Sequence, residues 1–111
     1  MKLIHVIFAA LLLLAPAIAD DSAALKSARQ HFGLVATRAT ANFKSADNIE
    51  ERLKAQGSTL HPSLVTLRLR IEAALDKAEA ALGKGDVKTA VEQTRQAEGM
   101  LDKFAKKLGG E

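Results

Sequence analysis

The chain contains no cysteine, tryptophan or tyrosine, and only two prolines. Without cysteine it has no disulfide framework, no thiolate ligand for a metal and no thiol nucleophile. The four phenylalanines are its whole aromatic content, so alanine and leucine supply most of the apolar side chains. A core of this composition is typical of long helices packed side by side.

The sequence also lacks the local patterns that carry catalysis or bind cofactors. There is no phosphate-binding loop and no dinucleotide fingerprint, and none of the five serines lies in a Gly-x-Ser-x-Gly elbow. Outside the N-terminal segment, His31 and His61 are the only histidines, and no histidine joins a carboxylate at metal-binding spacing. We therefore predict that the protein is not an enzyme and holds no cofactor or metal.

Net charge is small despite a calculated pI of 9.4. Without Lys2, which lies in the N-terminal segment, 15 lysines and arginines face 13 acidic residues, a net charge near +2. A field this weak does not favour nucleic-acid binding. We expect no nucleic-acid partner.

The first 19 residues have the pattern of a cleavable secretory signal. Lys2 gives a positive start, and residues 3–15 are apolar apart from one histidine. Ala17 and Ala19 form the small-x-small pattern that a signal peptidase reads, which predicts cleavage between Ala19 and Asp20.

Cleavage would leave residues 20–111, a length that suits one domain. The protein is then expected to be exported, either to a periplasm or out of the cell. The apolar run is shorter than the roughly 20 residues of a membrane span. An uncleaved N-terminal anchor is the alternative.

Three amphipathic segments follow, at about residues 22–56, 62–83 and 86–108, each with apolar residues three and four apart. No window shows the strict alternation of a strand. The seam of the first segment contains Leu25, Ala28, Phe32, Val35, Ala39, Asn42, Ala46, Ile49 and Leu53. The seam of the second contains Leu64, Leu67, Ile71, Ala74, Leu75, Ala78, Ala81 and Leu82. The seam of the third contains Val87, Ala90, Val91, Thr94, Ala97, Met100, Leu101, Phe104 and Leu108.

Short connections separate these segments, so neighbouring helices should run antiparallel. Pro62 suits the first turn of the second helix. Gly83 is expected as the left-handed residue that ends it, and Asp86 as the cap of the third. At Asn42, either this side chain or the neighbouring Phe43 takes the core position. The sequence therefore predicts an all-α, antiparallel three-helix bundle.

The first helix is much longer than the other two. If Leu53 packs level with Leu64, residues 22–34 overhang the hairpin formed by the second and third helices. A break near residues 45–48, where Asp47 and Glu50 have capping-box spacing, would instead give four helices.

Charge is also uneven along the first helix, because residues 22–46 contain no acid and four lysines or arginines. The overhanging, basic half is therefore a candidate surface for a protein partner, which would give an accessory, adaptor or chaperone-like module, or for self-association. An anionic membrane surface is an alternative partner for the same half. A small-ligand or metal-binding bundle that uses the acids of the first two helices is a second alternative. The residues predicted to form the contact surface are Leu25, Lys26, Arg29, Phe32 and Arg38.

The stretch from about residue 71 to 106 resembles the last hairpin of the cytochrome b562 family of small periplasmic bundles. The likeness lies in the alanine-rich helices, the Gly83-Lys84 turn and the Val87-Lys88-Thr89-Ala90 that follows. That family binds haem through a histidine late in its final helix, where this chain reads Phe104-Ala105-Lys106. The N-terminal methionine ligand is missing too. The resemblance implies the hairpin and no haem.

Overall fold

The computed structural model describes residues 19–110, which form three helices and, within that range, no strand. These helices are α2 (Ala19–Ala55), α3 (Pro62–Gly83) and α4 (Val87–Gly109). The prediction of an all-α three-helix bundle with a long first helix is confirmed. Residues 1–18, almost all of the predicted signal sequence, lie outside the described residues.

At the start of a helix, the first backbone N–H groups have no carbonyl partner within the helix, and a side chain before the helix can accept their hydrogen bonds. His61 precedes α3, where its imidazole Nδ1 accepts a hydrogen bond from the Ser63 backbone N–H at 3.1 Å. Asp86 caps α4 in the same way, since its carboxylate accepts from the Thr89 N–H at 3.2 Å. Between the two helices, Gly85 and not Gly83 has the left-handed backbone, with φ of 74°. Gly83 is still helical, so the predicted position of the turn glycine was two residues too early.

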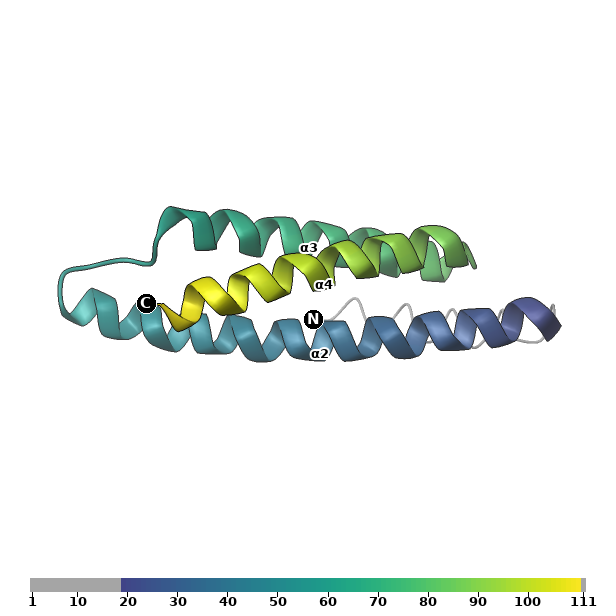
Figure 1. Cartoon of the computed structure of the whole chain (residues 1–111), viewed down its shortest axis with the longest axis horizontal. Helices are drawn as coiled ribbons and strands as arrows, with labels where there is room; N and C mark the ends of the chain where they lie inside the picture. The colour runs from purple at the N-terminus through teal and green to yellow at the C-terminus, as the bar shows by residue number, and fades with distance from the viewer. Residues whose placement is uncertain (1–18, 111) are drawn as a thin grey trace.

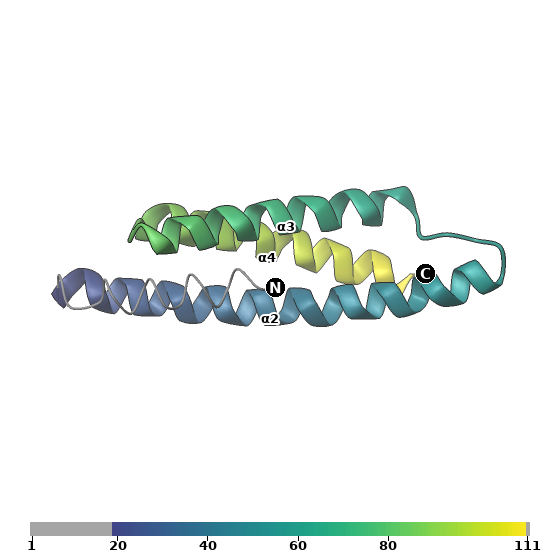
Figure 2. The same cartoon turned by 180° about the vertical axis from the view of Figure 1, so that it is seen from behind.

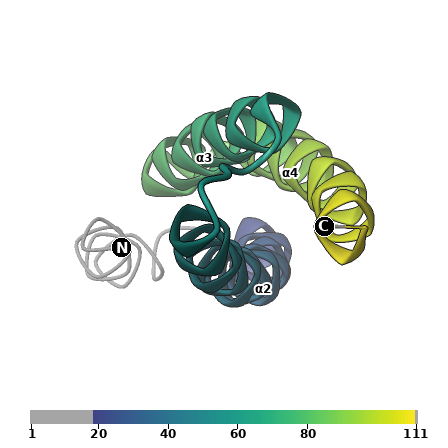
Figure 3. The same cartoon turned by 90° about the vertical axis from the view of Figure 1, so that its left-hand side faces the viewer.

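All three helices lie side by side in an elongated body measuring 55 × 22 × 16 Å (Figures 1 and 2). α3 runs antiparallel to α2, and α4 returns parallel to α2. α3 and α4 form the most closely packed pair, and α2 packs more extensively on α4 than on α3. Seen end-on, the helices occupy three corners around one shared interior (Figure 3).

The core follows the predicted seams. Ile71, Ala78, Ala97 and Leu101 are completely buried, at the interior positions of α3 and α4. On α2, Phe43 is buried whereas Asn42 is only partly covered, so the aromatic side chain takes the core position.

The long first helix is continuous. α2 passes through residues 45–48 without interruption, and Ala46 in that stretch is completely buried. The carboxylate of Asp47, the expected cap of a second piece, instead accepts a hydrogen bond from Arg68 of α3 at 2.7 Å. The four-helix alternative is therefore wrong.

The register of α2 differs from the one predicted. His31 contacts Glu98, with 3.2 Å between Nε2 and Oε1. Because α2 and α4 run parallel, positions the same number of residues before His31 and Glu98 also lie level with each other. Eleven residues before Glu98 is Val87, the start of α4, and eleven residues before His31 is residue 20. The start of α4 therefore lies near the first turns of α2 and not level with Val35, and only a short part of α2 extends past the hairpin (Figure 1).

The connection between α2 and α3 explains this shift. After Gly57, whose φ of 80° ends α2, the chain runs back along the bundle before α3 begins (Figure 1). Leu60 in this connection is buried and joins the core. The hairpin is thereby displaced toward the N-terminal half of α2, and the predicted overhang of residues 22–34 is wrong.

Candidate contact surface

The two apolar members of the predicted contact surface belong to the core. Leu25 and Phe32 are only 8% and 5% exposed, and both are part of the cluster that joins the three helices. They are buried because the hairpin covers the part of α2 that was expected to overhang. Neither side chain is available to a partner unless α2 moves away from α4.

The three cations of that predicted surface have different environments. Lys26 is exposed, and Arg29 is half-buried. Arg38 donates a hydrogen bond to the Asp102 carboxylate of α4. Together with the contact between His31 and Glu98, this pair ties the basic half of α2 to α4. Exposed pairs of this kind contribute about 0.2–1 kcal/mol each. Their main effect is to fix the position of α2 along α4, and their contribution to stability is small.

Three large apolar side chains are exposed in the part of the chain that the structure describes. Leu34 of α2 is 72% exposed, and Leu69 and Val65 of α3 are 63% and 49% exposed. Isolated apolar side chains on a surface are ordinary. Val65 and Leu69, however, lie on adjacent turns of one helix and form a local apolar surface, which is a feature of contact sites.

Val65 and Leu69 lie one helical turn apart, and the exposed Ala73 extends their row by a further turn. We call Val65, Leu69 and Ala73 the α3 patch. Exposed cations lie on one side of the row, at Arg70 and Lys77. The sequence carried a signal for this patch, since residues 65 and 69 are apolar yet fall off the seam through Leu64, Leu67 and Ile71.

Leu34 lies on the side of α2 that faces away from the bundle. It follows the buried Phe32 by two residues, a rotation of roughly 200° around the helix. The positions that share this side are exposed and uncharged from residue 23 to residue 48. We call them the outer face of α2: Ala23, Ser27, Gln30, Leu34, Thr37, Ala41, Ser45 and Asn48.

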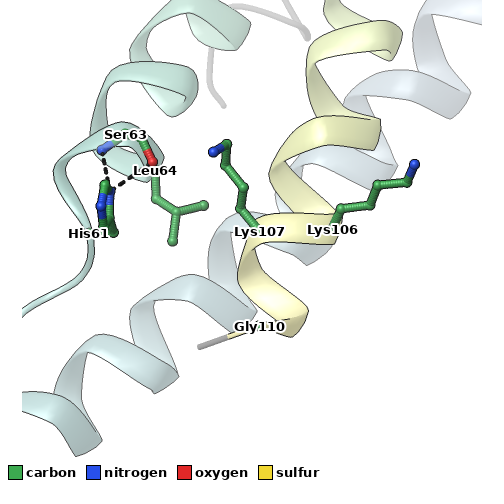
Figure 4. A pocket seen from close by; sticks show the side chains of 6 residues that line it. All are labelled: His61, Ser63, Leu64, Lys106, Lys107 and Gly110. Carbon is green, nitrogen blue, oxygen red and sulfur yellow. Dashed lines mark hydrogen bonds between the residues drawn. The ribbon is translucent and has the colours of Figure 1, made fainter.

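An open pocket lies where α3 begins beside the end of α4 (Figure 4). His61 and Ser63 line one side, and Lys106, Lys107 and Gly110 line the other. The His61 imidazole turns toward Ser63, which it caps, and only Lys107 extends toward Leu64, whereas Lys106 points away (Figure 4). The His61 imidazole therefore serves as the cap of α3, and the two lysine side chains do not point to a common site in the pocket.

The carboxylates do not gather into a metal site. Within residues 19–110, no group of three or more His, Asp or Glu side chains is arranged to hold an ion. Nor does any helix in that range have the length and apolarity to cross a membrane.

Glu79 is the one acid in the described core, 3% exposed on α3. Its Oε2 has no hydrogen-bond partner among the described residues. Burial raises the pKa of this carboxyl above its usual range, and the negative charge of Asp76 raises the pKa further. Glu79 lies one position beyond the seam residue Ala78, and nothing in the sequence distinguishes it from the other acids of this helix.

Comparisons with known proteins give no relative. No family model matches the chain, and neither does any curated protein or solved structure. The likeness of residues 71–106 to the last hairpin of cytochrome b562 proteins therefore stays a resemblance of sequence, without an independent match.

Proposed function

We propose that the protein acts by contact with another protein, as an exported accessory, adaptor or chaperone-like module that presents the α3 patch. The observation that carries this proposal is the exposure of Val65 and Leu69 on adjacent turns of α3. Burial of apolar surface stabilises a complex by about 25 cal/mol per Å². Two aliphatic side chains held on a rigid helix lose little conformational freedom on binding, so most of that gain is kept.

The charged side chains around the α3 patch indicate which kind of partner surface would fit it. Arg70 and Lys77 are exposed on one side of the row, and Asp76 is exposed near its far end. An amphipathic helix with an apolar stripe and acids along one edge is complementary to this arrangement. Rim charges of this kind speed association and select partners more than they add affinity.

The membrane-surface alternative used Leu25 and Phe32 as its apolar anchors. Both are now in the core, which leaves Leu34 as the one exposed large apolar side chain described in the basic half of α2. Stable binding to a membrane surface takes buried apolar area in addition to cations. The protein-contact proposal is favoured for this reason.

Export remains part of the proposal and depends on the Ala17 and Ala19 pattern. The intact mass of protein recovered from the exported fraction tests it. A chain that begins at Asp20 supports a cleaved signal, and a chain that retains residues 1–19 in the membrane fraction supports the anchored alternative.

The α3 patch is tested with a photo-crosslinking residue in place of Leu69, and with a matched control in place of Gln96, an exposed position on α4. We expect a defined adduct from position 69 and none from position 96. The partner, identified by mass spectrometry and purified, should bind the wild-type protein and lose at least tenfold in affinity for Leu69→Glu. Equal labelling from both positions would contradict the proposal.

A further inference from the structure

The outer face of α2 remains uncovered in the three-helix body. Leu34, the most exposed large apolar side chain among the described residues, lies near its middle. The α3 patch belongs to another helix, so the two surfaces can be altered separately.

We infer that the outer face of α2 binds a second copy of this chain, with the two α2 helices antiparallel. Opposing residues in this register have numbers that sum to about 75, which places Leu34 of one copy over Ala41 of the other. The same register places Gln30 opposite Ser45, and Ser27 opposite Asn48. Large side chains therefore meet small ones, which allows the helices to approach closely.

Charge complementarity selects the second copy and the antiparallel direction. Lys26, Lys44 and Glu51 are exposed on the same edge of the outer face, about 100–120° from Phe32 around the helix. Lys26 and Glu51 make no ion pair within the described residues. In an antiparallel pair, one edge faces the same edge of the partner, so each Lys26 lies near the other copy's Glu51. Two-fold symmetry makes this contact twice.

A parallel pair does not make this contact. In an in-register parallel pair, each Lys26 would lie about 38 Å along the axis from the other copy's Glu51, so the contact between them would be lost. The α3 patch is also a poor self-contact, because an antiparallel pair centred on it would bring the two copies of Arg70 close together. Of these arrangements, the antiparallel pairing of α2 is the one that brings Lys26 next to Glu51.

Cysteine crosslinking tests the register directly, because the natural chain has no cysteine. Two single variants, Gln30→Cys and Ser45→Cys, are oxidised separately and then as a mixture. We expect a disulfide-linked dimer in the mixture and little in either variant alone. In the proposed register, equivalent Gln30 residues lie about 22 Å apart along the helix axis, beyond the roughly 7 Å that a disulfide spans between Cα atoms.

Sedimentation equilibrium gives the second measurement. Leu34→Glu should convert the dimer to monomer, whereas Leu69→Glu, the matched control on α3, should leave it intact. Lys26→Glu should weaken the dimer about two- to thirtyfold through its two symmetric contacts. Adding Glu51→Lys to that variant should restore it.

Three outcomes would overturn the inference: a protein that stays monomeric at hundreds of micromolar, a dimer that Leu34→Glu leaves intact, or crosslinking of Gln30→Cys to itself in preference to Ser45→Cys. Circular dichroism and the melting temperature of each variant keep the result separate from loss of folding. Loss of the dimer in Leu34→Glu with unchanged binding of the α3 partner separates this inference from the proposed function.

Discussion

The rings of Phe43 and Phe104 meet edge to face, with centroids 5.5 Å apart and planes inclined by 81°. One ring belongs to α2 and the other to α4. The Arg68 guanidinium of α3 lies 4.7 Å from the centre of the Phe43 ring and also binds Asp47. All three helices therefore meet at this aromatic pair, where edge-to-face and cation–π contacts add to the burial of apolar area.

Truncation of Phe104 should destabilise the whole bundle. Phe104→Ala is expected to cost about 3–5 kcal/mol of unfolding free energy, because Phe104 is almost fully buried and its removal leaves a cavity. Urea denaturation followed by circular dichroism measures this loss. Leu69→Ala, at a 63% exposed position of α3, is the matched control and should change stability by less than about 0.5 kcal/mol. Similar losses in both variants would contradict the assignment of the core.

Because Phe32 is buried, its substitution should destabilise the protein, whereas an overhanging Phe32 could have been replaced at little cost. Phe32→Ser should destabilise the protein by about 3 kcal/mol or more, since it removes a buried aromatic ring and places a hydroxyl in the core. Lys54→Ser, at an exposed position of the same helix, should have little effect. A melting temperature of Phe32→Ser within two degrees of wild type would show that residues 22–34 are not packed on the hairpin.

Glu79 should make the protein less stable as the pH rises. The folded-state pKa of this carboxyl lies above its unfolded value, so the folded chain binds the proton more tightly. The ionised, buried carboxylate therefore imposes a penalty that is complete above the folded-state pKa. The penalty disappears as the pH falls to the unfolded value.

Glu79→Gln should accordingly raise the melting temperature at pH 7 and change it little near pH 4. A gain of about 1 kcal/mol corresponds to roughly 4–8 °C in a domain of this size. Thermal melts of the variant and of Glu92→Gln, an exposed control on α4, compare the two positions. An equal gain at both pH values would assign the effect to packing and not to ionisation.

The glycines of the hairpin should respond to alanine in opposite directions. Gly85 has φ of 74°, so Gly85→Ala forces a side chain into a left-handed conformation and should cost about 1–2 kcal/mol. Gly99 lies inside α4 with open space around the position of a Cβ atom. Gly99→Ala should therefore stabilise the protein by up to about 1 kcal/mol. Chemical denaturation of the two variants side by side measures both signs.

The helices and the Asp86 cap of α4 could be predicted from the sequence because they are local properties. The spacing of apolar residues, Pro62 at the start of α3 and Asp86 before α4 each act within a few residues of the chain. The buried seams of α3 and α4 followed from the same periodicity.

The register of α2 could not be predicted, because it depends on the path of the chain between Gly57 and Pro62. A connection of this length permits α3 to start level with the end of α2 or further back. The apolar Leu60 was the available signal, since a buried side chain in the connection holds it against the bundle. The predicted contact surface was wrong for the same reason, because Leu25 and Phe32 were expected to be exposed on an overhang that does not exist.

The pairing of α2 with α4 has a consequence for how the chain reaches its fold. α3 and α4 are neighbours in sequence and join through short loops, so their contacts are local and form quickly. The contact between His31 and Glu98 spans 67 residues, and it needs the final helix to be present. During synthesis, the apolar side of α2 therefore stays without its main partner until the end of the chain has emerged. A newly made chain is most open to chaperones, and to aggregation, through its first helix, and completion of its last helix ends that exposure.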